Sequence, residues 1–371
     1  MDDDVVRAHL QMIESLDNKL GAFETVFSDD AMRQAHLADI EISAGSYIGP
    51  LHGIPFAIKD IFDLEGTICT KGSLALKKNR SECTGTVVQR LISAGGIIIG
   101  KTKTVEHAFG GWGTNQKMGT PWNPWDTKNH RIPGGSSSGS AVATAAKMAV
   151  FAIGSDTGGS IRLPAAFCGI TGLKLTEGTI PCDGIMPLSQ TLDTPGPITQ
   201  NIVDSTILLE IIKGRNSSKI SDDLLKNRGI YAGLRKKIKG MRFGIITPEE
   251  REHCSNEVLK SYDNVIEKIL YLGAHVDTFK PPVDYSTLAD DNGAITAIEA
   301  YSNHRKLYER VELPLDEDVR QRIFEGRKYS AFEYLDMLNI RESRKEKFLC
   351  EMNTFDALLT PTFKSVAPKV D

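Results

Sequence analysis

Two serine-containing, glycine-rich segments and an upstream lysine supply the parts of a nucleophilic site. The segments are Gly134–Ser140 and Asp156–Arg162, and the lysine is Lys59, at the end of the apolar run Ile54–Ile58. A serine hydroxyl is inert at neutral pH until a base takes its proton, and a neutral lysine can act as that base. Glycines around Ser160 let backbone N–H groups converge on one point, as an oxyanion hole requires. The pattern predicts acyl transfer through a serine.

With their flanks, these segments resemble the amidase-signature family of serine hydrolases. Ser136 and Ser160 are 24 residues apart, which is that family's spacing, and further matching stretches follow in order between Gly53 and Pro197. The resemblance implies that Ser160 is the nucleophile, Ser136 the bridging serine and Lys59 the base. Alone, a lysine after a strand is most often a solvated cap, and a glycine-serine segment is most often a turn. The catalytic interpretation depends on the agreement of separate segments.

The resemblance also implies the surroundings of this triad. It predicts a cis peptide bond between Gly135 and Ser136. The oxyanion amides are expected at Thr157, Gly158, Gly159 and Ser160. The substrate-facing residues are expected at Ala108, Gly110, Gly111 and Trp112. Supporting roles are expected for Ser137, Asp156 and Arg162, the last two as an ion pair that braces the loop.

Two other motif matches point to different chemistry. Gly95–Thr102 fits the P-loop pattern, but three consecutive isoleucines between its glycines favour a buried strand over an open phosphate loop. Gly135–Gly139 fits the nucleophile elbow of α/β-hydrolases, which would make Ser137 the nucleophile. That motif needs a strand directly before it, and Asn129–Pro133 is a poor strand. We therefore expect neither nucleotide binding nor an elbow.

Composition is that of an ordinary globular protein. The chain has 371 residues and a net charge of −4, which gives no reason to expect nucleic acid or an anionic membrane as a partner. Its six cysteines are scattered without metal-ligand spacing, so we expect no structural metal and reduced thiols. The acyl-enzyme chemistry implied by the resemblance needs no cofactor. The acidic N-terminus has no apolar signal segment, and no apolar run is long enough to span a membrane. A cytoplasmic location is the expectation, and a homodimer stays open.

Hydrophobic periodicity predicts alternating helices and strands. The expected helices are 5–39, 86–94, 138–149, 204–213, 258–272 and most of 303–349. The expected strands are 54–58, 97–99, 149–154, 241–246 and 357–359. Such alternation predicts an α/β fold with a sheet covered on both faces, and the resemblance specifies a single α/β/α domain around one large mixed sheet.

Within that domain, residues 1–50 are expected to form an N-terminal helical segment and 53–200 the catalytic core. Residues 214–240 are rich in lysine and arginine and are expected to form a solvated connector. Residues 241–371 are expected to complete the sheet with further strands and helices. By comparison with the family, this last part is expected to be short or truncated.

The resulting hypothesis is an amidohydrolase that cleaves a linear C–N bond through an acyl-enzyme on Ser160. The substrate would be a small amide or carbamate, or a related anilide or urea. Two alternatives stay open. One is the glutaminase component of a glutamine-dependent amidotransferase, with a partner protein, although the loop Gly110–Asn115 looks more like the stand-alone amidases. The other is an incomplete, inactive homologue that only binds.

Overall fold

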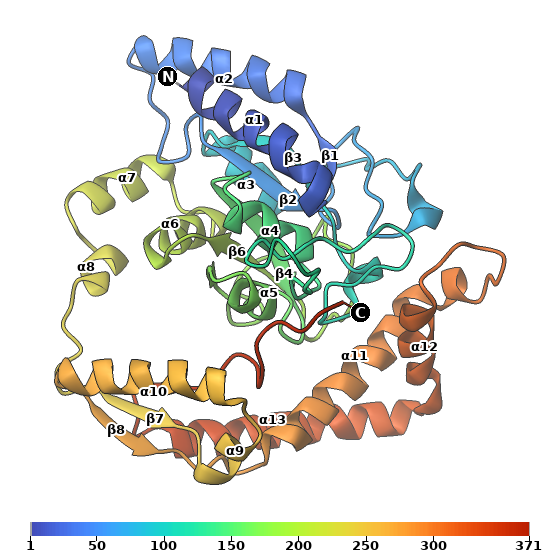
Figure 1. The fold of residues 1–371 in the computed structure, drawn as a ribbon, viewed down its shortest axis with the longest axis vertical. Helices are drawn as coiled ribbons and strands as arrows, with labels where there is room; N and C mark the ends of the chain where they lie inside the picture. The colour runs from blue at the N-terminus through green and yellow to red at the C-terminus, as the bar shows by residue number, and fades with distance from the viewer. Residues whose placement is uncertain (1, 371) are drawn as a thin grey trace.

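The computed structural model describes residues 2–370 and is built on a six-stranded mixed sheet (Figure 1). The strands are ordered β1-β3-β2-β4-β6-β5. Strand β2 runs parallel to both β3 and β4, whereas β1, β6 and β5 each pair antiparallel with their neighbours. The strands are β1 (Phe23–Val26), β2 (Pro55–Lys59), β3 (Ile97–Thr102), β4 (Phe151–Asp156), β5 (Thr171–Gly172) and β6 (Thr194–Thr199).

Strands β2 and β4 position the chemistry. Every residue of both strands is buried, as expected for parallel strands with both faces covered. Ile58 lies opposite Ile153, so Lys59 and the end of β4 meet at the same edge of the sheet. In open α/β sheets, ligands bind at the carboxyl ends of the strands.

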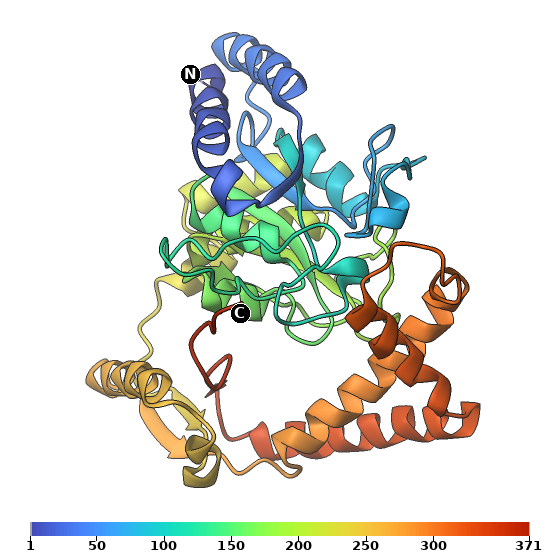
Figure 2. The ribbon, with the colours of Figure 1, turned by 45° about the vertical axis from the view of Figure 1, so that its right-hand side comes forward.

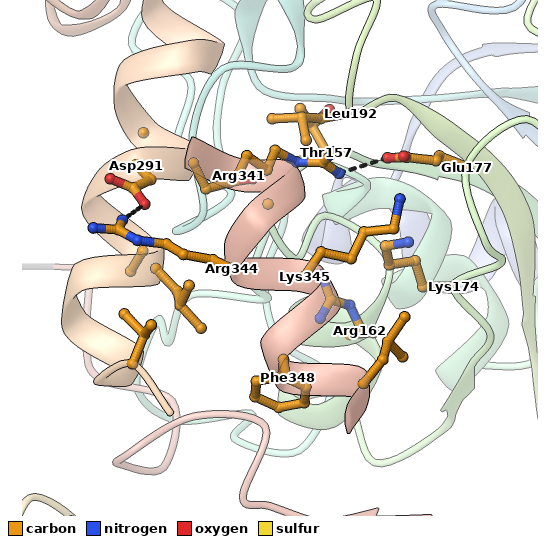
Figure 3. Close-up of a pocket in the computed structure, with 17 residues that line it drawn as sticks. Thr157, Arg162, Lys174, Glu177, Leu192, Asp291, Arg341, Arg344, Lys345 and Phe348 are labelled. Atoms are coloured by element: carbon orange, nitrogen blue, oxygen red, sulfur yellow. Dashed lines mark hydrogen bonds and ion pairs between the residues drawn. The ribbon is translucent and has the colours of Figure 1, made fainter. Parts of the chain in front are cut away.

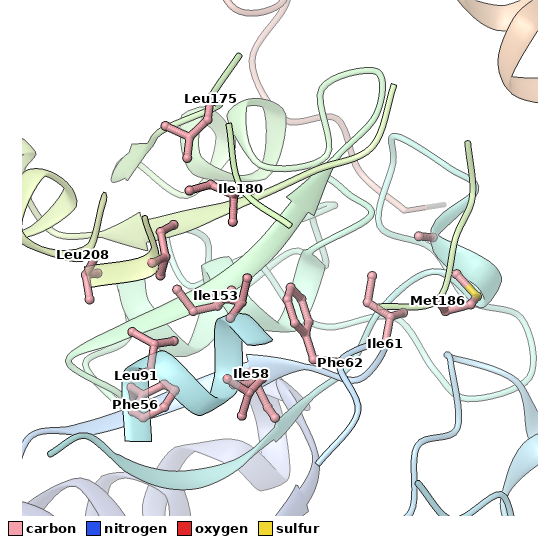
Figure 4. Packing of buried hydrophobic residues seen from close by; sticks show 14 of the residues in the cluster. Phe56, Ile58, Ile61, Phe62, Leu91, Ile153, Leu175, Ile180, Met186 and Leu208 are labelled. Carbon is pink, nitrogen blue, oxygen red and sulfur yellow. The ribbon is translucent and has the colours of Figure 1, made fainter. Parts of the chain in front are cut away.

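Helices cover both faces of the sheet, as predicted. Side chains alternate along β2, so Phe56 and Ile58 enter one core while Ala57 enters the other. The first core, shown in Figure 4, packs against α3 (Thr86–Ser93) and α6 (Ile202–Ile212). The second packs against α1 (Asp2–Leu20), α2 (Ser28–Ser43) and α4 (Ser138–Ala145). The α/β/α prediction is therefore confirmed.

The C-terminal strands form a sheet of their own. Strand β7 (Arg242–Ile245) pairs in parallel with β8 (His275–Thr278) and β9 (Ala357–Leu359), in the order β8-β7-β9. Figure 2 shows this sheet well apart from the central one. The expectation that residues 241–371 complete one large sheet is therefore wrong. Both edges of β7 are occupied by its neighbours, and the outer strand β5 of the central sheet offers only two residues for pairing.

The remaining helices are mostly C-terminal. They are α5 (Arg162–Phe167), α7 (Ser217–Leu225), α8 (Ile230–Leu234), α9 (Pro248–Glu252), α10 (Asn256–Tyr271), α11 (Tyr285–Tyr308), α12 (Glu317–Glu325) and α13 (Ala331–Met352). Short 3-10 turns occupy 74–76, 106–108 and 326–328. Helices α11 and α13 contact each other at an oblique crossing below the central sheet (Figures 1 and 2).

Three local expectations need correction. The predicted helix 5–39 is interrupted by β1, because Gly21 takes a positive φ and the chain then pairs with β3. The predicted helix 138–149 ends at Ala145. The connector 214–240 contains α7 and α8, and it buries Ile220 and Tyr231 against the first core, so it is only partly solvated.

Candidate active site at the carboxyl ends of β2 and β4

Lys59 lies fully buried at the end of β2, with two serine hydroxyls beside its amine. Its Nζ is 2.7 Å from the Oγ of Ser136 and 2.9 Å from the Oγ of Ser155. Burial lowers the pKa of Lys59 from 10.5 to about 7, and the negative charges of Asp193 and Asp156 oppose this shift. At pH 7 an amine with this pKa is uncharged in about half of the molecules, and the uncharged form can accept a proton.

Asp60, the next residue, faces the opposite side of the strand, as the alternation of side chains predicts. Its carboxylate accepts a hydrogen bond from the backbone N–H of Thr70 and lies 3.6 Å from the Nζ of Lys101. Burial raises the pKa of Asp60, and the Lys101 charge acts against that rise. Asp60 therefore contributes to a separate buried pair with Lys101.

The first serine segment lies between Lys59 and the second segment. The Gly135–Ser136 peptide bond is cis, as predicted, and Ser136 is fully buried. The N–H of Ser137 donates to the carbonyl of Ser160 at 3.2 Å, which joins the two segments. The hydroxyl of Ser137 donates to the carbonyl of Ser155 at 3.2 Å, so it braces the end of β4.

The second segment is organised by Asp156. Its buried carboxylate accepts the N–H groups of Gly159 at 2.8 Å and Ile161 at 3.0 Å, and it is held by Arg162 through two nitrogens at 2.8 and 3.0 Å. Burial alone would raise the pKa of Asp156, but the hydrogen bonds and charge of Arg162 and the backbone N–H groups hold it below its usual value. The predicted brace between Asp156 and Arg162 is therefore present.

One of the predicted oxyanion amides already donates its hydrogen bond within the protein. The N–H of Gly159 points to Asp156, so it stabilises the loop. Thr157, Gly158 and Ser160 stay as the predicted donors, because all three residues line the pocket described below.

Sequence reasoning missed two neighbours of Lys59. Ser155 lies one residue beyond the predicted strand 149–154 and has no signal of its own. Asp193 lies just before β6, which was not predicted. The Asp193 carboxylate accepts from the hydroxyl of Thr157 and from the N–H of Leu188 at 2.8 Å. Burial raises its pKa, and these hydrogen bonds and the Lys59 charge act against that rise. The available signal was the position of Asp193 itself, a carboxylate directly before Thr194, whose strand pairs with β4.

A pocket of about 270 Å³ opens above Ser160. All four predicted substrate-facing residues lie on its wall together with part of the predicted oxyanion loop. Its lining also includes Asn292 and Thr296 from α11 and Arg322 from α12. Trp112 is 43% exposed and packs edge-on against Phe363, with ring centres 5.5 Å apart.

The loop that carries Ala108 is held from behind by the C-terminal helices. His107 and Ala108 both have positive φ values, 48° and 58°, which non-glycine residues seldom adopt and which tend to occur at functional sites. The Nδ1 of His107 lies 2.8 Å from the hydroxyl of Tyr308, which donates to Glu106 at 2.7 Å. His107 thus joins this loop to α11.

The two competing motifs take other roles. The P-loop match ends inside β3, with Gly100, Lys101 and Thr102 all buried in the sheet. Ser137, the serine of the elbow motif, is fully buried and bonded to the β4 backbone. The elbow motif would also need a catalytic histidine later in the chain. His304 contacts the carbonyl of Pro187 at 2.8 Å, and His275 lies on β8 in the other sheet.

Among residues 2–370, no group of three or more His, Cys, Asp or Glu side chains is arranged to hold a metal ion. No helix in the same range combines the length and apolar character needed to cross a bilayer.

Comparisons with known proteins agree with this geometry. The amidase family model matches residues 4–371. A glutamyl-tRNA(Gln) amidotransferase subunit from Alkaliphilus metalliredigens is 35% identical over 97% of this chain and 78% of its own length. A crystal structure of an amidase superposes with a TM-score of 0.87 at 28% identity, covering all of this chain and 80% of that one. The crystal structure of the corresponding glutamyl-tRNA(Gln) amidotransferase subunit from Thermotoga maritima gives a TM-score of 0.76 at 31% identity, covering 100% of this chain and 78% of that one.

These similarities to amidases and to amidotransferase subunits indicate an enzyme that acts on C–N bonds. By the extent of the family match and the shared mixed-sheet architecture, this chain belongs to the amidase family.

Proposed function

We propose that this protein hydrolyses a linear amide or a related C–N bond through a covalent acyl-enzyme on Ser160. The observation that carries the proposal is the buried amine of Lys59, whose pKa is about 7, at 2.7 Å from the hydroxyl of Ser136. In the proposed reaction the neutral amine takes the proton of Ser136, which takes that of Ser160. The Ser160 oxygen then bonds to the substrate carbonyl carbon.

The N–H groups of Thr157, Gly158 and Ser160 would stabilise the negative charge that develops on the carbonyl oxygen. The C–N bond breaks, and the protonated Lys59 returns its proton, through Ser136, to the leaving amine. Water then attacks the acyl-enzyme by the same route, which releases a carboxylic acid and restores Ser160.

The test combines a covalent probe with kinetics. A fluorophosphonate should label the wild type and the Ser137→Ala variant but not Ser160→Ala. Turnover should fall by about 10⁴–10⁶-fold in Ser160→Ala and less in Ser136→Ala, because a water can bridge to Lys59. Near-normal turnover by Ser160→Ala, or labelling that depends on Ser137, would contradict the nucleophile assignment. A wild type that is neither labelled nor active would favour an inactive binding homologue.

A second candidate is the glutaminase component of an amidotransferase. It is favoured by the similarity to proteins named as glutamyl-tRNA(Gln) amidotransferase subunits. The two candidates differ in what the purified chain does alone. We expect it to cleave simple amides without a partner. Ammonia release from glutamine, with no turnover of simple amides or anilides, would instead favour the glutaminase.

A further inference from the structure

A second, larger cavity adjoins the proposed catalytic pocket. It has a volume of about 610 Å³, and it shares Thr157, Gly158, Asn292 and Gly293 with the pocket above Ser160. Its walls come from the segment that follows Ser160 and from helices α11 and α13 (Figure 3). A ligand bound at Ser160 can therefore extend into it.

The cavity wall carries more positive than negative side chains. Its lining contains two carboxylates, Glu177 and Asp291. The five cationic side chains of the lining are Arg162, Lys174, Arg341, Arg344 and Lys345.

The arginines in this set have carboxylate partners. Arg341 pairs with Glu177 at 2.7 Å, and Arg344 pairs with Asp291. Arg162 is held by Asp156, as described above. Any cation of the wall without a carboxylate partner must therefore be one of the two lysines.

Among the described residues, Lys174 is the cation of this wall without a carboxylate partner, and Lys345 shares its carboxylate with Arg341. The Nζ of Lys174 donates to the carbonyl of Leu175 at 2.6 Å, and no carboxylate of residues 2–370 lies within ion-pair distance of it. Lys345 pairs at 2.9 Å with Glu342, which Arg341 also contacts. Figure 3 shows the Lys345 side chain extending from α13 toward the region of Lys174.

Lys174 is a partly buried ammonium. Burial lowers its pKa, and among the nearby charges Asp156 and Glu177 act against this shift, whereas Arg162 and Arg341 add to it. Removal from water disfavours the charged form of an amine. A bound anion would offset that cost and form charge-assisted hydrogen bonds with the ammonium groups.

The cavity wall is also partly apolar. Its larger apolar side chains come from the loop before β6, from α11 and the segment before it, and from α13. They are Leu192, Val283, Leu288, Phe348 and Leu349. A ligand that fills the cavity thus needs an apolar body as well as a negative group.

We infer that this cavity binds the far end of the substrate, and that this end is a carboxylate on an apolar body. Lys174 and Lys345 contact the carboxylate, and the apolar residues contact the chain that joins it to the scissile amide. A single negative charge suits the wall, because its arginines already have carboxylate partners. The inference rests on the proposed function, since it assigns the substrate class of the same site.

The kinetic test uses matched substrates. These are p-nitroanilides of straight-chain acids with four to eight carbons, each made with a terminal carboxylate and with a terminal hydroxyl. For the best chain length we expect kcat/KM to favour the carboxylate by about tenfold or more, mainly through KM, and less so at high salt. Lys174→Gln and Lys345→Gln should each reduce this preference several-fold. Lys347→Gln, on the exposed surface of the same helix, should leave it unchanged.

A binding test separates the two proposals. The dissociation constants of the same compounds are measured by calorimetry with Ser160→Ala and with Ser160→Ala/Lys174→Gln, after thermal melting shows that both are folded. Tighter binding of the carboxylates, weakened by Lys174→Gln, supports the cavity assignment even if Ser160 is not the nucleophile. Equal binding or no binding of carboxylates and alcohols overturns it, as does a wild-type preference that neither lysine variant changes. Hydrolysis without such a preference overturns the cavity assignment alone.

Discussion

Lys59 is expected to determine how activity depends on pH. With its ordinary pKa of about 10.5, only about one lysine in 3,000 would be neutral at pH 7. Burial at the end of β2 lowers the pKa to about 7, so about half of the molecules then hold a neutral amine. The structure therefore raises the population of the active base by about 10³-fold at pH 7.

The direction of the pH dependence follows from this shift. Protonated Lys59 cannot accept a proton, so kcat/KM should fall about tenfold for each pH unit below 7 and level off above about pH 8. Lys59→Arg keeps its positive charge throughout this range, because a guanidinium does not deprotonate in proteins. We expect that variant to lose about 10³-fold or more in kcat/KM and to show no rise in activity with pH.

The assay is kcat/KM from about pH 5 to 10 for the wild type and Lys59→Arg. Lys101→Arg is the matched control, since Lys101 is also fully buried in the central sheet but pairs with Asp60, away from the serines. Circular dichroism and thermal melting confirm that each variant is folded. An active Lys59→Arg enzyme, or a wild-type profile that is flat between pH 5 and 8, would refute the reasoning.

Further predictions concern stability and the residues around the triad. Because unfolded lysine holds a proton that folded Lys59 releases above pH 7, the unfolding free energy of the wild type relative to Lys59→Met should rise with pH. The slope should be about 1.4 kcal/mol per pH unit between pH 7 and 10, measured by urea denaturation; a flat difference would contradict the lowered pKa. Ser155→Ala removes a hydroxyl that accepts from the Lys59 ammonium, so the apparent pKa in the kcat/KM profile should fall, and Ser155→Thr should restore it. Asp156→Asn should lower the free energy of unfolding by about 2–4 kcal/mol, seen as a lower Tm together with slower turnover; an unchanged Tm would show that the loop does not need the charge. Gly139→Ala places a Cβ 2.1 Å from the carbonyl oxygen of Ala22 and should destabilise the fold strongly, whereas Gly233→Ala, with open space around it, should be neutral.

Several parts of the fold could be predicted from the sequence because they depend on local pattern. The buried runs around Ile58 and Ile153 are apolar and short, which is typical of parallel strands covered on both faces. The helices 86–94 and 204–213 and the strand 357–359 were predicted close to their observed bounds. The serine segments were recognisable because glycines and serines at that spacing resemble one family.

Other elements depended on partners that the local sequence does not reveal. Strand β6 contains Pro195 and Pro197, which argue against a strand, yet its pairing with β4 holds it extended. Strand β1 falls inside a predicted helix for a similar reason, because only its pairing with β3 at Phe23–Thr102 distinguishes it. The separate C-terminal sheet also depends on long-range pairing, between residues more than 100 positions apart.

For the candidate site, the sequence alone determined the residue types and their order along the chain. It identified Lys59, Ser136 and Ser160 as the candidate base, bridging serine and nucleophile, since an amine and two hydroxyls can carry out these roles. Only the tertiary structure decided their surroundings: the hydroxyl of Ser155 beside the amine, the carboxylate of Asp193 nearby, and the Gly159 amide turned toward Asp156. The second cavity likewise exists because α13 is packed beside the segment that carries Lys174, about 170 residues earlier in the chain. Burial and proximity are properties of packing, and these two set the pKa of the base and the charge that a substrate meets.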